Sequence, residues 1–452
     1  MQKRVSIHGQ WSSKLIFILA ATGSAVGLGN IWKFPYMAGD NGGAAFVLVY
    51  LLAIAMVGLP IMIAEILLGR RGRQSPINTM RTLAQEERTS GFWILLGWLG
   101  VLSGLLILSF YSVIAGMTAG YTVRAIGGVF TGITAEQAQT MLANLTADPE
   151  RLLAWHTIFM AMVVVVAARG VRSGLEQAVK ILMPTLLVLL LFLMGYAVVE
   201  GDFEAGYEFL FSVDFSAVTP SVILDAMGQA FFTLSLGMGA IMIYGSYLPD
   251  HTSIAGTSFT VAAADTLVAL VAGLAIFPMV FAYGLEPNAG FGLIFETLPL
   301  AFGEMPGGVW VGTAFFLLLL FAAWTSAISL MEPIVAWLAE NRGLSRIMAA
   351  ATSGILIWLL GIGTLLSFNL LQDFTLFGLT IFESLDFLTA NIMLPLGGLL
   401  IAIFVGWIMS RGSVEHEMDI GNSLGFRLWY FLIRFIAPLL VLLVFLSQIG
   451  IL

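Results

Sequence analysis

The chain contains no cysteine, so it has neither a disulfide bond nor a thiolate metal site. Histidine is scarce as well, and the four histidines lie too far apart in the sequence to pair at metal-ligand spacing, at His8, His156, His251 and His416. No phosphate-binding loop of the GxxxxGK type is present. Without a thiol, or a histidine near a candidate hydroxyl nucleophile, the sequence does not predict an enzyme.

Charge is also in short supply, because charged residues make up only 10% of the chain, against roughly 25% in an average soluble domain. Hydrophobic residues make up 59%, and eleven apolar stretches are long enough to span a bilayer. They cover residues 13–38, 43–69, 92–126, 152–168, 175–199, 220–247, 256–284, 307–339, 345–366, 375–410 and 427–449. The composition predicts an all-α polytopic membrane protein with eleven transmembrane helices, forming a single domain over residues 1–452.

Lysine and arginine are distributed unevenly between the predicted loops. If the N-terminus is cytoplasmic, the inner segments hold most of these residues, and the outer loops keep only Arg124 and Arg151. Inner loops of membrane proteins are enriched in Lys and Arg, so a cytoplasmic N-terminus and, after eleven spans, an extracytoplasmic C-terminus are expected. Lys33 and Arg434 lie inside predicted spans. The first span has no small-residue cleavage site, so we expect a retained helix rather than a signal peptide.

Two of the spans are interrupted by glycine. Residues 21–36 read ATGSAVGLGNIWKFPY, and residues 231–240, FFTLSLGMGA, repeat the Gly-apolar-Gly pattern. Glycine costs a helix about 1 kcal/mol relative to alanine, and backbone amides cannot stay unpaired in lipid. A break at these positions must therefore face protein or a water-filled site, where its free carbonyls and amides can hold a cation and a carboxylate. The pattern indicates a transport site.

The two breaks fall in the first and sixth spans, which begin two halves of five spans each. Five crossings reverse the direction of the chain, so the pattern predicts an inverted repeat with helices 1 and 6 broken at mid-membrane. The repeats are residues 13–199 and 220–410, and residues 427–449 form an extra helix. A single glycine pair more often serves close helix packing, but two copies at matching positions favour broken helices.

Four motifs resemble the neurotransmitter:sodium symporter family: GSAVGLGNIWKFPY at residues 23–36, NGGAAF at 41–46, FFTLSLGMGA at 231–240 and LDFLTANIMLPLGG at 385–398. The resemblance covers essentially the whole chain, and eleven spans rather than twelve is typical of the bacterial amino-acid-transporting branch. The broken helices and the inverted repeat are known features of this family, so the resemblance implies them as well. It also implies a sodium-coupled amino-acid symporter of the bacterial inner (plasma) membrane that works by alternating access, as a monomer or weak homo-oligomer without nucleic acid.

The resemblance implies two sodium sites built from oxygen ligands, which a small hard cation prefers. The first would use the substrate carboxylate and the residues Ala25, Asn30, Thr233 and Asp265. The second would use the carbonyls of Gly23, Val26 and Ala322 and the hydroxyls of Thr325 and Ser326. An alternative for these two hydroxyls is a hydrogen bond to their own helix.

Asp265 lies in the apolar run TVAAADTLVALVAG. In chloride-dependent relatives this neighbourhood is neutral, and a chloride ion is held by groups that match Tyr50, Gln229 and Thr233. A buried carboxylate needs a cation or a proton, so the resemblance implies transport without chloride and leaves open a proton-coupled carrier with Asp265 as the proton site. Glu65, also inside a span, is interpreted as structural and hydrogen-bonded to the break in the sixth span.

The resemblance also implies a substrate cavity that is mostly apolar, as small-molecule sites are. Its lining would be Ser24, Ala25, Leu28, Gly29, Ile107, Tyr111, Phe232, Thr233, Ser235, Met238, Ser326 and Leu330. Carriers of monoamines usually have an aspartate at the position of Ser24, so a zwitterionic amino acid is expected here. The flexible Met238 suits a large side chain, which favours neutral hydrophobic L-amino acids, aromatic or branched.

The resemblance also implies two gates, an outer one and an inner one, at positions that match those of the family. Lys33 and Asp386 match the outer ion pair, in which a lysine lacks the bidentate geometry of the usual arginine. On the inside Trp11 matches a family tryptophan, His8 replaces the usual arginine, and Arg4 is expected to reach the acidic partner Glu340.

The fifth predicted span carries a further family feature. The spacing of Gly174 and Pro184 is known from a helix whose cytoplasmic end unwinds to hydrate the second sodium. An ordinary helix start and a proline kink explain this spacing equally well.

Overall fold

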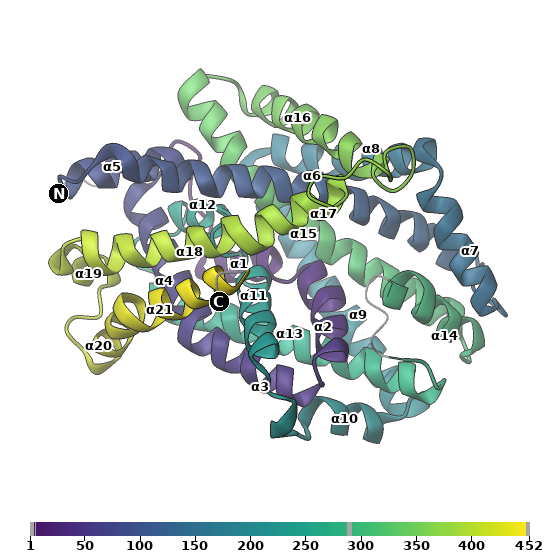
Figure 1. The fold of residues 1–452 in the computed structure, drawn as a ribbon. Helices are drawn as coiled ribbons and strands as arrows, with labels where there is room; N and C mark the ends of the chain where they lie inside the picture. The colour runs from purple at the N-terminus through teal and green to yellow at the C-terminus, as the bar shows by residue number, and fades with distance from the viewer. Residues whose placement is uncertain (1–3, 5, 287–291, 449–452) are drawn as a thin grey trace.

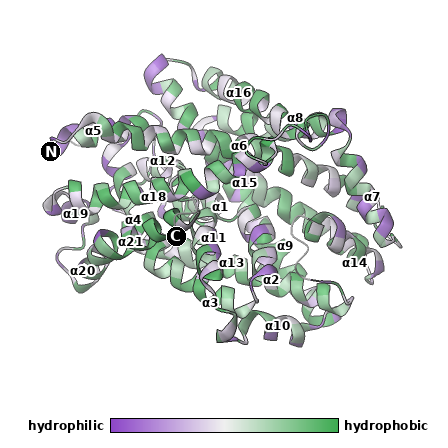
Figure 2. Cartoon of the chain, viewed as in Figure 1, coloured by the Kyte–Doolittle hydropathy of each residue, from purple (hydrophilic) through white to green (hydrophobic). Residues whose placement is uncertain are grey.

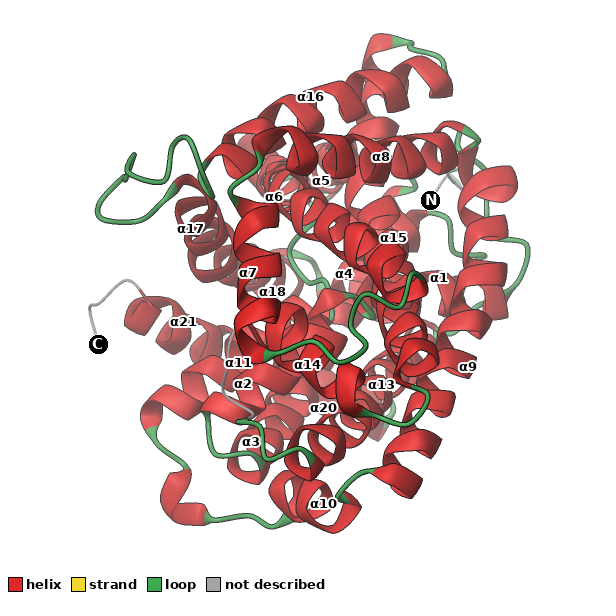
Figure 3. Cartoon of the chain, turned by 90° about the vertical axis from the view of Figure 1, so that its right-hand side faces the viewer, coloured by secondary structure: helices red, strands yellow, loops and turns green. Residues whose placement is uncertain are grey.

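The computed structural model describes residue 4, residues 6–286 and residues 292–448. Within these ranges the chain is helical and forms no β-strand, apart from an isolated bridge between Leu376 and Leu379 (Figure 3). The predicted all-α class is therefore confirmed.

Nine helical stretches in the described part of the chain are long and apolar enough to cross a membrane. They comprise α3 (Ala44–Ala53) with α4 (Leu59–Gly72), α6 (Ile94–Ile126), α8 (Pro149–Ala168), α9 (Glu176–Glu200), α13 (Ile254–Ala282), α15 (Gly308–Arg342), α16 (Arg346–Leu366), α17 (Ile381–Asp386) with α18 (Leu394–Ile403), and α20 (Leu424–Phe431) with α21 (Ala437–Gln448). The pair α1 (Lys14–Ala25) and α2 (Phe34–Asp40), with the π-helical turn Gly29–Lys33 between them, makes a tenth, bent span.

The remaining helices are short. They are α5 (Pro76–Glu86), α7 (Ala135–Thr146), α10 (Phe203–Phe211), α11 (Pro220–Thr233), α12 (Ala240–Ser246), α14 (Leu298–Glu304) and α19 (Arg411–Met418). The helices α11 and α12 cover the predicted sixth span, and each is too short to cross alone. By length and composition the described residues thus contain nine or ten spans, against the predicted eleven.

The long helix α15 forms the centre of the bundle, where it packs against α6, α9 and α16 (Figure 1). Of the 18 most apolar consecutive residues of α15, 83% are buried, whereas the corresponding value for the span Leu424–Ser447 is 28%. Hydrophobic residues cover both inner and outer helices (Figure 2), as expected for a protein whose outer surface faces lipid rather than water.

Helix starts follow from local sequence. The Ser13 hydroxyl accepts a hydrogen bond from the Ile16 amide and caps α1, and the Thr219 hydroxyl accepts one from the Val222 amide and caps α11. Pro220 occupies the first turn of α11, where a backbone N–H would have no partner within the helix, so proline costs no hydrogen bond there. These caps fix where the two helices that end at the site begin.

Candidate functional site

The first predicted break is present. The helix α1 ends at Ala25, and Val26 is extended with φ −70° and ψ 99°. The two helical parts are bent by 52°, and the Asn30 side chain accepts a hydrogen bond from the Gly27 amide at 3.2 Å. Glycine at 27 allows a close approach to α15, because a Cβ there would lie 2.5 Å from Ser326 Oγ.

The second predicted break is also present. The helix α11 ends at Thr233 and α12 begins at Ala240, and the segment between them contains positive φ angles at Ser235 (53°), Gly237 (75°) and Gly239 (72°). The Gly237 amide donates to Glu65 Oε2 at 3.1 Å. The interpretation of Glu65 as a partner of this break is therefore confirmed.

The two breaks face each other. Ser235 Oγ donates to the Ser24 carbonyl at 2.9 Å, and Gln229 Nε2 donates to the Gly29 carbonyl at 2.7 Å. Ser326 Oγ, from α15, donates to the same Ser24 carbonyl at 3.0 Å. Backbone groups that a continuous helix would pair internally are thus available to side chains and ligands.

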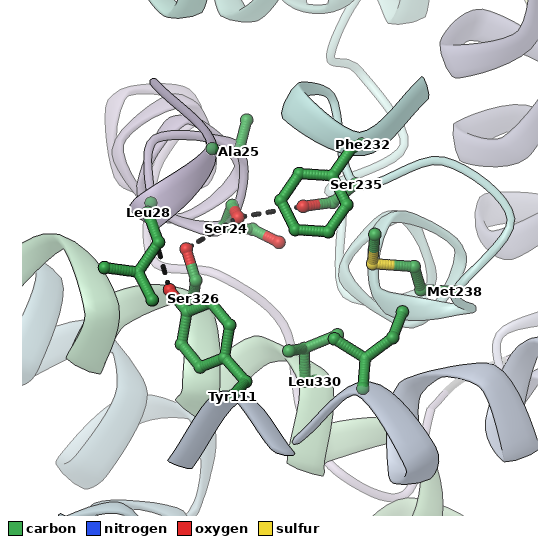
Figure 4. A pocket seen from close by; sticks show the side chains of 12 residues that line it. Ser24, Ala25, Leu28, Tyr111, Phe232, Ser235, Met238, Ser326 and Leu330 are labelled. Atoms are coloured by element: carbon green, nitrogen blue, oxygen red, sulfur yellow. Dashed lines mark hydrogen bonds between the residues drawn. The ribbon is translucent and has the colours of Figure 1, made fainter. Parts of the chain in front are cut away.

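A cavity of about 20 Å³ lies between the breaks, and Figure 4 shows the side chains that surround it. Its lining contains every predicted substrate residue except Thr233, namely Ser24, Ala25, Leu28, Gly29, Ile107, Tyr111, Phe232, Ser235, Met238, Ser326 and Leu330. Gly27 also lines the cavity, although it was not among the predicted lining residues. Its position in the Gly-apolar-Gly pattern of the first break could have identified it. The volume accommodates a water molecule rather than an amino acid, so the structure shows the site closed.

Thr233 is directed instead toward Asp265 on α13, which is fully buried. The Thr233 hydroxyl donates to Asp265 Oδ2 at 2.9 Å, and Asn30 Nδ2 donates to Oδ1 at 2.8 Å. These side chains, all predicted for the first sodium site, come from both breaks and from α13, and they form one polar cluster. No group of three or more His or acidic side chains suited to a metal occurs in the described ranges. The cluster itself contains one carboxylate, one hydroxyl and one side-chain amide.

The residues predicted for the second sodium site meet where α1 packs on α15. Ser326 Oγ lies 3.4 Å from the carbonyl oxygens of both Gly23 and Val26. The Thr325 hydroxyl donates to the Ala322 carbonyl of its own helix at 3.0 Å. A bond of this kind was the alternative to sodium coordination for this hydroxyl. Sequence reasoning missed Ser329, whose hydroxyl accepts a bond from Ser24 Oγ at 2.7 Å; it lies about one turn after Ser326.

The predicted outer ion pair is not formed. The Lys33 ammonium lies 4.4 Å from the centroid of the Phe232 ring, and no salt bridge joins Lys33 to Asp386, both of which the structure describes. The aromatic face stabilises this cation, and Phe232 itself lines the cavity.

On the opposite side Trp11 is buried, and its indole donates to the Tyr244 carbonyl at 3.1 Å. The prediction that Arg4 reaches Glu340 is wrong, because Arg4 pairs with Glu86 at 2.5 Å. His8 occupies that place, with Nε2 3.1 Å from the Glu340 carboxylate. Six residues separate Arg4 from Trp11, whereas two separate His8 from Trp11, and this greater distance along the chain allows Arg4 to reach a different carboxylate.

Glu340 is held by further contacts. It accepts hydrogen bonds from the Ser75 amide at 2.8 Å and from Asn78 Nδ2 at 2.7 Å. This carboxylate therefore joins the N-terminal segment, α5 and the end of α15.

The predicted unwinding segment is helical here. Gly174 lies in a π-helical turn, Val171–Leu175, that leads into α9, and Pro184 lies inside that helix. A cavity of about 210 Å³ adjoins these first turns, lined on the α15 side by Trp324.

The sequence matches the Sodium:neurotransmitter symporter family over residues 8–131 and 142–451. It is 41% identical to the sodium-dependent transporter YhdH of Bacillus subtilis (strain 168) over 98% of both chains, and 33% identical to a sodium-dependent transporter of Haemophilus influenzae over 97% of both. Its structure is similar to that of MhsT in complex with L-phenylalanine, with a TM-score of 0.91 and 46% identity over 97% of this chain and 99% of that one. With two broken helices around one cavity and a family match over nearly its whole length, this chain belongs to the sodium:neurotransmitter symporter family.

Proposed function

We propose that this sodium-dependent symporter carries neutral, hydrophobic L-amino acids of about the size of phenylalanine by alternating access, without a chloride requirement. The observation that carries the proposal is the meeting of two helix breaks at one cavity, polar at the backbone end and apolar at the other.

The polar end suits the part that all α-amino acids share. The Leu28 amide donates to the Tyr111 hydroxyl at 3.4 Å, and both can turn to an incoming carboxylate. The Ser24 carbonyl, which now accepts from two serine hydroxyls, can accept from the substrate ammonium. At the apolar end Ile107, Met238 and Leu330 provide a surface for a hydrophobic side chain. MhsT, 46% identical, has been solved with L-phenylalanine, which supports an aromatic substrate here.

Binding requires the cavity to enlarge from its closed volume of about 20 Å³. The Phe232 ring and the Lys33 ammonium that rests on it form one movable unit beside the cavity. Their displacement frees Lys33 to pair with Asp386, so the outer ion pair belongs to another stage of the cycle.

Two sodium ions accompany the substrate. The first binds Ala25, Asn30, Thr233 and Asp265 with the substrate carboxylate, and the second binds Gly23, Val26, Ala322, Thr325 and Ser326. Each charge that crosses 100 mV provides about 2.3 kcal/mol, so two ions provide about 4.6 kcal/mol. At about 1.36 kcal/mol per decade this suffices for roughly thousandfold accumulation from voltage alone. The Asp265 carboxylate replaces the chloride that other members of the family use.

The topology follows the same scheme. Helices α11 and α12 act together as the broken sixth span, which brings the total to eleven, and residues 13–199 and 220–410 form the inverted repeats. The protein lies in the bacterial plasma membrane with its N-terminus in the cytoplasm, and it works as a monomer or weak homo-oligomer.

The proposal is tested with purified protein in proteoliposomes that take up radiolabelled L-phenylalanine. An inward sodium gradient is expected to drive accumulation, and replacement of chloride by gluconate is expected to leave uptake unchanged. Uptake that persists in sodium-free buffer at low external pH would support the proton-coupled carrier instead. A thermal-shift screen of the twenty amino acids, with and without sodium, identifies the preferred substrate.

A further inference from the structure

Arg434 lies inside the last span and has no role in the transport site. It belongs to the π-helical turn Leu432–Ile436 between α20 and α21. Its Nε is buried without a hydrogen-bond partner, and its guanidinium forms no salt bridge within the described residues. A charged side chain within a membrane is costly, so one without a carboxylate partner draws attention to the groups around it.

Aromatic rings hold this guanidinium at the end of the preceding span. Its carbon lies 4.4 Å from the centroid of the Trp407 ring and 5.9 Å from that of Tyr430. Trp407, from the turn Phe404–Ile408 that ends its span, is 52% exposed, and its indole donates to the Arg434 carbonyl at 2.8 Å. The guanidinium therefore lies level with the end of that span. Stacking uses the faces of the guanidinium and leaves N–H groups at its edge free to donate.

Two more arginines lie at this corner. The Arg411 guanidinium carbon is 5.7 Å from the Tyr430 ring, so Arg411 and Arg434 approach the same aromatic side chain. Arg411 and Arg427 both donate to Asn422 Oδ1, at 3.0 and 3.1 Å. None of the three arginines forms a salt bridge in the part of the chain that the structure describes. The three guanidinium groups thus lie at one corner of the protein without a carboxylate of the described residues in salt-bridge contact.

An apolar surface continues from this corner into the bilayer. Phe431, Phe435 and Leu439 are exposed along α20, the turn and α21. Figures 1 and 2 show these helices beside α18 at the edge of the bundle, with mostly hydrophobic residues.

We propose that this corner is a binding site for an anionic phospholipid. Its phosphodiester accepts hydrogen bonds from the arginines, and its acyl chains lie along the exposed apolar face. Basic pockets beside membrane helices favour such head groups, and the planar guanidinium fork matches phosphate oxygens. The site consists of Trp407, Arg411, Arg427, Tyr430 and Arg434.

Native mass spectrometry of the purified full-length protein, incubated with equal amounts of phosphatidylglycerol and phosphatidylcholine, tests this inference. Each arginine near a membrane surface contributes about a fivefold preference for an anionic lipid. The wild type is expected to retain phosphatidylglycerol selectively. Arg434→Gln is expected to reduce the ratio of bound phosphatidylglycerol to phosphatidylcholine about fivefold, and removal of all three arginines about a hundredfold.

Arg342→Gln is the matched control, because Arg342 is an exposed arginine at the end of α15 and lies outside the site. An equal ratio for the wild type, Arg434→Gln and the control would overturn the proposal. Displacement of the lipid by millimolar inorganic phosphate would also overturn it, since the site would then bind a free anion. If Arg434→Gln does not fold, two other variants give the same comparison. Arg411→Gln is expected to lower the ratio of bound phosphatidylglycerol to phosphatidylcholine, and the charge-conserving Arg434→Lys is expected to retain it.

Discussion

Replacement of Asp265 by asparagine tests the role of the buried carboxylate in sodium binding. The substitution keeps the shape of the side chain and the bond to Asn30 or Thr233, but it removes the negative charge. Two unit charges about 4 Å apart interact by about 4 kcal/mol at an effective dielectric constant of 20. Removal of the carboxylate also removes the cost of keeping it buried, which offsets part of that loss. We take half of the attraction, about 2 kcal/mol, as the net effect, which weakens sodium binding about 30-fold.

The assay is sodium-dependent binding of radiolabelled L-phenylalanine to the purified protein, measured at constant ionic strength over a range of sodium concentrations. Asp214→Asn is the control, since Asp214 lies outside the spans, is exposed and caps only a short turn. Addition of chloride is expected to restore part of the lost affinity in the Asp265→Asn variant, because Thr233 lies beside the vacated charge and Gln229 lies about one turn before Thr233 on α11. A half-saturating sodium concentration equal to that of the wild type would refute the reasoning.

Three further substitutions probe the surrounding structure. Glu340→Gln weakens the hydrogen bonds that Glu340 accepts from Ser75. Amide hydrogen exchange across residues 6–13 is therefore expected to become about tenfold faster. Unchanged exchange would show that the Glu340 carboxylate does not hold residues 6–13 in place. Glu65→Gln weakens the bond from the Gly237 amide at the second break, and a loss of about 1–3 kcal/mol should appear as a lower Tm in thermal unfolding, whereas an equal Tm contradicts the contact. Pro184→Ala is expected to slow transport at unchanged sodium affinity if the start of α9 unwinds; an unchanged rate would identify an ordinary kink.

The helix breaks could be predicted from the sequence, because their cause is local. Gly27 and Gly237 provide the close approach and the positive φ angle that other residues resist, and both lie within apolar runs that otherwise favour a continuous helix. The cavity lining followed from the family resemblance, since it comes from segments far apart in the chain.

Side-chain partners were less predictable, because they depend on distances between elements. Lys33 stacks on Phe232, whereas the motif implied a bond to Asp386. Arg4 and His8 lie in a segment without regular structure before α1, and which of them meets Glu340 depends on the path of that segment. The number of spans also differs, with eleven predicted and nine or ten identified by length and composition in the described residues, since a broken helix of two short parts lacks the length that identifies a span.

The length of α15 connects two regions of the transporter that are far apart. Its 35 residues extend about 52 Å, well beyond the roughly 30 Å hydrocarbon layer. Ser326 beside the cavity and Glu340, which contacts His8, lie on this one helix, about 21 Å apart at about 1.5 Å per residue, with Pro333 between them. A tilt of about 10° with Ser326 as the pivot would carry Glu340 almost 4 Å, more than the length of a hydrogen bond. A small rotation of α15, without any unfolding, can thus break the contacts that Glu340 makes with His8, Ser75 and Asn78.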